Sequence, residues 1–134
     1  MSLFGSLSIS GSGVDAAQTW LNTIAGNIAN MNDVSKTDQA AYGAQAPVFM
    51  PNAIPGQVGD GVAVAGIQEG DTTGIVQYDP TNPQADAQGL VRVPDVQLSS
   101  QMVNMIQAQT DFQANTSALA DAKTAYQSAL TLGT

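Results

Sequence analysis

Large apolar side chains recur at every seventh position in the C-terminal part of the chain. They form one row of a predicted helix: Leu98, Met105, Phe112, Leu119 and Tyr126. A second, mixed row is expected four residues after the first: Met102, Gln109, Thr116, Lys123 and Leu130. No Pro or Gly interrupts residues 96–132, so the pattern predicts a single helix, about 50 Å long between Leu98 and Leu130. A chain of 134 residues cannot bury most of such a helix in its own core.

The beginning of the chain has the same period. One row consists of Leu7, Val14, Leu21 and Ile28, and a second row consists of Ala17, Ile24 and Met31. We expect a helix to begin near Val14 with Ser10 or Ser12 as its N-cap, because a Ser hydroxyl accepts hydrogen bonds from the free N–H groups of a helix start. Residues 1–12, rich in Ser and Gly, are expected to be frayed. The helix should end near Asn30, since Asn tolerates the backbone of a C-cap.

Residues 34–95, between the two helices, show turn and β-strand patterns. Candidate strands lie at residues 45–50, 61–69, 74–78 and 89–93, and a loop with Pro55 and Gly56 joins the first two. A rigid turn is predicted where two prolines fix φ, at Asp79, Pro80, Asn82 and Pro83. The predicted fold class is α+β: N- and C-terminal helices (residues 1–33 and 96–134) pair as a coiled coil, with a small β-hairpin and loop region between them (residues 34–95).

The composition removes most enzymatic chemistry. The chain has no Cys and no His, which eliminates thiol nucleophiles, Ser-His-Asp triads and nearly all zinc sites. Gly11-Ser12-Gly13 lacks the preceding strand and the Lys of a phosphate-binding loop. The acidic side chains have no neighbours that would separate their pKa values for acid–base work. We therefore expect no catalytic residue, no metal site, no cofactor and no small-molecule substrate.

The net charge of −8 limits the classes of partner that the chain can bind, because only Lys36, Arg92 and Lys123 are basic. Nucleic acids and anionic lipids bind clustered basic residues, so both are disfavoured as partners. No apolar stretch reaches the ~18 residues of a membrane-spanning helix. Residues 1–12 have neither a basic residue nor a sustained apolar core, which argues against a secretory signal.

Charged side chains are rare in both helical segments. Residues 1–32 contain only Asp15, and residues 96–134 contain only Asp111, Asp121 and Lys123. One interpretation is a helix with a neutral polar face. We favour another, in which protein surrounds the helices on most sides and other chains supply the neighbours, because amides cross an interface without the desolvation cost of a charge.

Three patches of the sequence resemble one known protein family. Residues 26–30, Gly-Asn-Ile-Ala-Asn, resemble the Asn-Ile/Leu-Ala-Asn signature near the N-terminus of flagellar rod and hook axial proteins. The turn and strand that precede the last helix of the proximal rod subunit are similar to residues 78–91 and 94–96. The last helix of that subunit is similar to residues 102–109, 112–115 and 130–133. Together the patches cover about the first 35 and the last 60 residues.

The resemblance implies a structural subunit of the proximal rod of the bacterial flagellar basal body. Such a subunit assembles helically, transmits torque and surrounds the export channel. Its implied partners are copies of itself, the other proximal and distal rod subunits, the rod-to-MS-ring adaptor and the flagellar export apparatus. It would reach the periplasmic rod through the flagellar type III system, without a cleaved signal peptide.

Both the repeat and the resemblance single out candidate residues for helix packing and assembly. They are Val14, Leu21, Ile24, Asn27, Ile28, Asn30, Leu98, Met102, Met105, Phe112, Asn115, Leu119, Tyr126 and Leu130. The chain departs from the family at Asp95, usually Asn, and at residues 110–112, where Thr-Asp-Phe stands in place of a pattern with Arg and Tyr. An acid in place of a base puts the ion pairs between subunits in doubt.

Two other functions remain open at this point: another flagellar axial or adaptor protein, or a monomeric coiled-coil module that binds a protein. A binding module should be compact and cooperative alone, whereas a rod subunit should have poorly ordered ends until it assembles. An enzyme is the third and most distant alternative.

Overall fold

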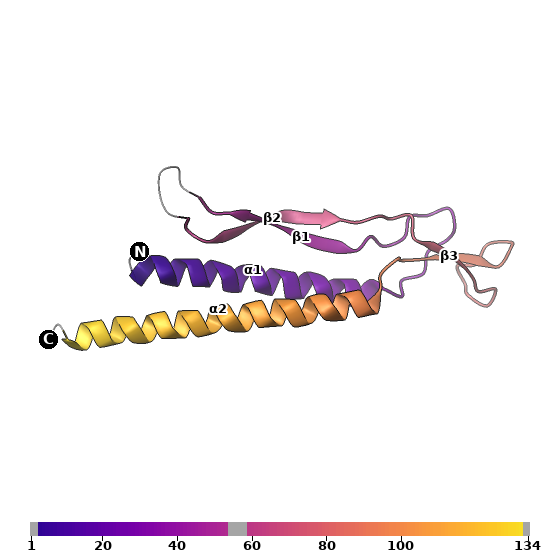
Figure 1. Cartoon of the computed structure of the whole chain (residues 1–134). Helices are drawn as coiled ribbons and strands as arrows, with labels where there is room; N and C mark the ends of the chain where they lie inside the picture. Colours follow the sequence, from indigo (N-terminus) through magenta and orange to yellow (C-terminus); the bar gives the residue numbers. More distant parts are fainter. Residues whose placement is uncertain (1–2, 54–58, 133–134) are drawn as a thin grey trace. The chain divides into compact units, whose positions relative to one another are not determined.

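A computed structural model describes residues 3–53 and 59–132 (Figure 1). These residues form α1 (Leu3–Asn30), β1 (Gln45–Pro51), β2 (Val62–Glu69), β3 (Ile75–Tyr78), β4 (Leu90–Val93) and α2 (Leu98–Leu132). The strands make two two-stranded sheets, β1 with β2 and β3 with β4. The α+β fold class, all four strands and the end of α1 at Asn30 are confirmed. Pro55 and Gly56 of the predicted loop lie outside the described residues.

The chain divides into two compact units. The first unit consists of residues 1–21, 47–66 and 106–134, and the second consists of residues 22–46 and 67–105. Each unit therefore combines parts of both helices with part of the intervening segment. None of the helices in the described residues combines the length and the apolar character that crossing a membrane requires.

The start of α1 differs from the prediction, because the helix begins at Leu3 and continues through Ser10 and Ser12. Neither Ser is an N-cap, and the expected fraying is wrong for residues 3–12. Ser12 Oγ donates to the carbonyl of Ile9 at 2.8 Å inside the helix and accepts the N–H of Val62 at 3.1 Å. Tertiary contacts of this kind stabilise a helical segment whose Ser and Gly content alone would not.

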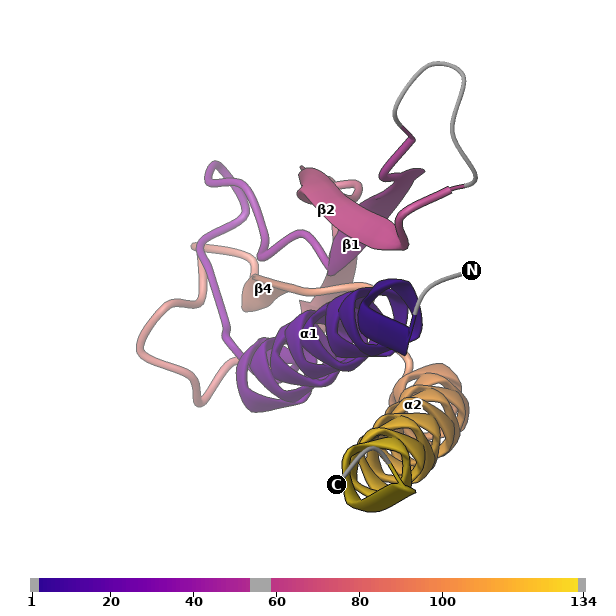
Figure 2. The ribbon, with the colours of Figure 1, turned by 90° about the vertical axis from the view of Figure 1, so that its left-hand side faces the viewer.

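In the first unit, the N-terminal part of α1 runs antiparallel to the C-terminal part of α2 (Figure 2). The rings of Phe4 and Tyr126 pack edge to face with their centroids 5.5 Å apart. Phe112 and Leu119, in the same row as Tyr126, are half-buried. The second row of α2 was predicted wrongly: Gln109, Thr116 and Lys123 are exposed. The row that packs lies three residues after the first row instead of four, and it is formed by Ala108, Asn115 and Ala122.

Small residues explain the position of this second row. Ala108 has no exposed surface, and Gly13 of α1 faces Asn115 so closely that an added Cβ would lie 2.6 Å from Asn115 Cγ. Asn115 is held in place because its Nδ2 donates to the carbonyl of Asp111 at 2.8 Å. The search for large apolar side chains missed this row, since short side chains here allow the helices to approach closely.

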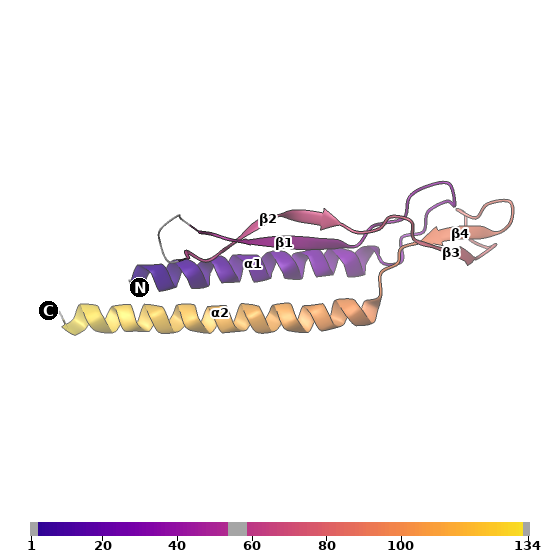
Figure 3. The same cartoon turned by 45° about the horizontal axis from the view of Figure 1, so that its top comes forward.

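The second unit contains the β3–β4 hairpin (Figure 3), which pairs antiparallel from Ile75 with Val93 to Tyr78 with Leu90. Val91 of β4 is buried, and so are Ala41 and Val96 of the same unit. The guanidinium group of Arg92 donates to the carbonyls of Thr37, at 2.7 Å, and Thr73. These bonds attach the loop after α1 to the hairpin.

Carboxylates organise the turns of the second unit. Asp79 accepts from Thr81 Oγ1 at 2.8 Å and from Asn82 Nδ2 at 3.3 Å, and the predicted turn follows it. Asp86 accepts from the N–H of Leu90, the N–H of Gln88 and the hydroxyl of Thr37, each at 2.9 Å. The N–H of Leu90 is the main cause that lowers the pKa of Asp86 below its ordinary value of 3.8, and desolvation opposes it.

Asp86→Asn should make stability less sensitive to acid. Because the folded-state pKa lies below the unfolded value, ionised Asp86 stabilises the folded chain above that unfolded value, and the contribution is lost as the pH falls through the folded pKa. Urea unfolding at a series of pH values from about 5 to about 2 measures the difference. Asp38→Asn is the control, since Asp38 is exposed and its carboxylate accepts no hydrogen bond from the described residues. An equal acid response in both variants would contradict the assignment.

Gly11→Ala and Gly13→Ala should have different effects on the free energy of unfolding. Ala is favoured over Gly inside a helix by about 1 kcal/mol, and a Cβ at Gly11 would meet nothing within 4 Å, so the first variant should be stabilised. A Cβ at Gly13 must displace the Asn115 amide, so Gly13→Ala should be less stable than Gly11→Ala by about 1–2 kcal/mol. Equal stabilisation of the two variants would show that Asn115 moves aside without cost.

Candidate assembly site

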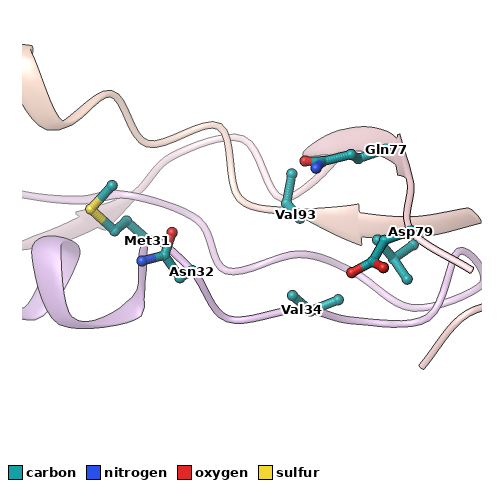
Figure 4. A pocket seen from close by; sticks show the side chains of 7 residues that line it. Met31, Asn32, Val34, Gln77, Asp79 and Val93 are labelled. Atoms are coloured by element: carbon teal, nitrogen blue, oxygen red, sulfur yellow. The ribbon is translucent and has the colours of Figure 1, made fainter. Parts of the chain in front are cut away.

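A pocket of about 250 Å³ lies in the second unit beside the hairpin. Figure 4 shows Met31, Asn32 and Val34 from the segment after α1 on one side and Gln77, Asp79 and Val93 on the other. Asp79 is the only titratable group among the residues that line it. The Thr81 hydroxyl is the main cause that lowers the pKa of Asp79, and Asn82 adds to it. The Asp79 carboxylate therefore stabilises the turn, and no second titratable side chain is among the residues that line this pocket.

The described residues contain no group of three or more His, Cys, Asp or Glu side chains placed to hold a metal ion. The features that stand out are instead a buried amide and an exposed apolar surface. Both belong to the helices.

Asn27 is the most completely bonded side chain of the second unit, and it is only 2% exposed. Its Nδ2 donates to the carbonyl of Gln45 at 2.8 Å and to Gln101 Oε1 at 3.1 Å. Its Oδ1 accepts from the Tyr42 hydroxyl at 2.9 Å and from the N–H of Gln45 at 2.8 Å. Both donors and both lone pairs of the amide are therefore used, and they join α1, the start of β1 and the first turns of α2.

Asn27 lies one turn before the last residue of α1, and its side chain bonds to other segments of the chain. Asn30 does form a local bond, since its Nδ2 donates to the carbonyl of Gly26 at 2.8 Å. Gln101, the partner of Asn27 on α2, was missed, because an amide in a helix seam carries no hydrophobic signal.

The remaining candidate residues fall into two groups. Packed positions are buried or half-buried: Val14, Leu21, Ile24, Ile28, Met105, Phe112, Asn115, Leu119 and Tyr126. Leu98, Met102 and Leu130 are exposed in the described chain, so they do not join the helix seam in which they were predicted. Their part in assembly stays a prediction.

An exposed apolar face runs along the first turns of α2. It consists of Leu98, Met102, Val103 and Ile106, and we call it the α2 outer face. Met102 is 54% exposed, Val103 66% and Ile106 64%. The spacing places all four on one side of the helix. Grouped apolar side chains of this size, exposed on a soluble surface, typically mark an interaction site.

Asn27→Ala should destabilise the chain by about 2–3 kcal/mol, because it removes the four hydrogen bonds of the Asn27 amide and leaves the buried side chain of Gln101 without its partner. Urea unfolding followed by circular dichroism measures the loss. Asn22→Ala, an exposed position on the same helix, should change stability by no more than about 0.5 kcal/mol. A loss in Asn27→Ala as small as that in the control would show that the amide is not a structural junction.

Comparison with known proteins identifies the family. The model described as "Flagellar basal body rod FlgEFG protein C-terminal" matches residues 87–132, which contain β4 and α2. The flagellar basal-body rod protein FlgC of Salmonella typhimurium is 38% identical over 133 residues, which cover 99% of both chains. FlgC of Yersinia enterocolitica is 40% identical over the same coverage, and FlgC of Bacillus subtilis is 28% identical over 99% of both chains. The chain therefore belongs to the FlgC family of flagellar basal-body rod proteins.

Proposed function

We propose that this structural subunit of the flagellar basal-body rod assembles through the α2 outer face. The single observation that supports the proposal is the exposure of Met102, Val103 and Ile106 on a helix whose opposite side is already packed within the chain. Burial of apolar surface stabilises an interface by roughly 25 cal/mol per Å². A neighbouring subunit that covers these side chains therefore stabilises the assembly through contacts that the free chain lacks. The family is structural, and the chain is not an enzyme.

The arrangement in the rod is part of the same proposal. The chain occupies the proximal rod, where copies stack heterologously as an open helical array, because the same surfaces repeat without closing. The array surrounds the export channel and transmits torque through packed helices. Family membership supports these roles, and the scarcity of charge on α2, limited to Asp111, Asp121 and Lys123, supports close contact with neighbouring protein.

The partners and the route of delivery are part of the same proposal. Family membership places the chain at the flagellar basal body. We extend this to contacts with the proximal and distal rod subunits, the rod-to-MS-ring adaptor and the export apparatus. Delivery to the periplasmic rod through the flagellar type III system, without cleavage of a signal peptide, belongs to the same proposal.

Val103→Asp tests the proposal, since the variant places a charge on the α2 outer face. Val103 is exposed, so the free energy of unfolding of the purified protein should change by about 0.5 kcal/mol or less. Rod assembly should nevertheless fail, because an interface would bury an unpaired carboxylate. Swimming in soft agar and electron microscopy of isolated basal bodies provide the readout in cells.

Ser100→Asp is the matched control, because Ser100 is an exposed polar residue in the first turn of the same helix and the change adds the same charge. Cells with this variant should swim normally. Normal swimming of the Val103→Asp cells would refute assembly through the α2 outer face.

A further inference from the structure

A second pocket, of about 370 Å³, lies in the first unit. Apolar side chains line one part of it: Ala16, Trp20, Phe49 and Val62. Asp111 and Asn115 of α2 line another part. The pocket therefore places one carboxylate beside aromatic surface, an arrangement that the resemblance did not indicate.

The aromatic part of the pocket is accessible. The rings of Trp20 and Phe49 pack edge to face, with centroids 6.2 Å apart and planes at 71°. Phe49 is 42% exposed although it is a large apolar residue. Partly exposed aromatic rings attract both the apolar stem and the charged end of a basic side chain.

Asp111 lacks a cationic partner. Its Oδ1 accepts one hydrogen bond, from Gln107 Nε2 at 3.1 Å, and no ion pair to Asp111 occurs within the described residues. The nearby amide of Asn115 is directed to the backbone carbonyl of Asp111 instead. Asp111 is half-buried as a residue, and its carboxylate keeps lone pairs that no hydrogen bond within the described residues uses. Such a carboxylate at the edge of an apolar pocket favours a charged donor.

The charge of the chain indicates where such a donor comes from. The chain has 3 basic residues against 11 acidic ones, and Arg92 is already bonded to two carbonyls. A second copy of the chain, with a net charge of −8, has few cations to offer to Asp111. The complementary partner is therefore a different, more basic protein.

We propose that this pocket receives an arginine side chain from a different neighbouring protein of the rod, with the guanidinium group on Asp111 and the stem against Trp20 and Phe49. Arg fits better than Lys, because its planar group both stacks on aromatic rings and binds a carboxylate in two places. The inference rests on the proposed function, since it assigns one of the contacts by which the subunit meets a neighbour.

Trp20 allows a direct binding test, because it is the only Trp in the chain. The full-length protein is titrated with a blocked tri-arginine peptide and, separately, with the matching tri-citrulline peptide, which has the same shape without charge. We expect a saturable change in Trp20 fluorescence with tri-arginine, about fivefold weaker binding for Asp111→Asn, and loss of the signal at high salt. An equal response to tri-citrulline, an unchanged affinity of Asp111→Asn, or no response to tri-arginine would each overturn the proposal.

Cells carrying Asp111→Lys test the contact in the rod, with Asp121→Lys as a control. Asp121 is an exposed acid on the same helix and lies outside the pocket. We expect Asp111→Lys alone to reduce swimming. Equal effects of the two variants would mean that only net charge matters and would overturn the proposal. The same loss of swimming in cells carrying Lys36→Gln or Lys123→Gln would also overturn the proposal. It would mean that a lysine of a second copy, and not an arginine of another protein, binds Asp111.

The Val103→Asp variant separates this proposal from the function on which it rests. If Val103→Asp cells do not swim while Asp111→Lys cells swim normally, the pocket proposal fails and the rod function stands. If both variants swim normally, assembly in the rod through this helix fails as well.

Discussion

The amide of Asn27 is the interaction on which the second unit depends. Four hydrogen bonds converge on one side chain that is almost completely buried. An Asp would lose both donors, and an apolar residue would leave four groups unsatisfied, so the site accepts only a carboxamide of this length. The small apolar core around Ala41, Val91 and Val96 is supplemented by polar junctions at Asn27, Arg92 and Asp86. The scarcity of large apolar residues in the middle of the chain is consistent with this design.

The first unit depends on the close approach of its two helical segments instead of on a network of side-chain hydrogen bonds. Gly13, Ala108 and Asn115 bring the two helices together, and the large side chains Phe112, Leu119 and Tyr126 fill the adjacent space. This seam is satisfied within one chain, whereas most of the remaining surface of α2 is exposed. What is left for neighbours is the exposed surface, including the α2 outer face and the pocket beside Trp20.

The sequence predicted the fold where its signals were strong and local. The repeat of Phe112, Leu119 and Tyr126 defined α2, and Pro and Gly between short apolar runs located the four strands to within one residue at each end. Two features could not be predicted in this way. The first turns of α1 are helical because of contacts with β2 and α2, which helix propensity does not contain. The second row of α2 consists of Ala and Asn, which resemble surface residues unless the partner helix is known.

The candidate site was predictable only in part. Asn27 was found through its resemblance to a family signature, yet its partners Tyr42, Gln45 and Gln101 come from positions 15 to 74 residues away, and no spacing rule connects them. The residues Leu98 and Met102 were selected as seam residues and proved to lie on the exposed side. Periodicity identified them as apolar helix positions, but it could not decide whether the chain itself or another molecule covers them.

The contact between Gly13 and Asn115 has a consequence for how this sequence can change over time. The two residues share one small volume, so a larger residue at position 13 requires the side chain at position 115 to move or to become smaller. Substitutions at the two positions should thus be coupled among descendants of this chain. Substitutions at most surface positions do not depend in this way on a second position.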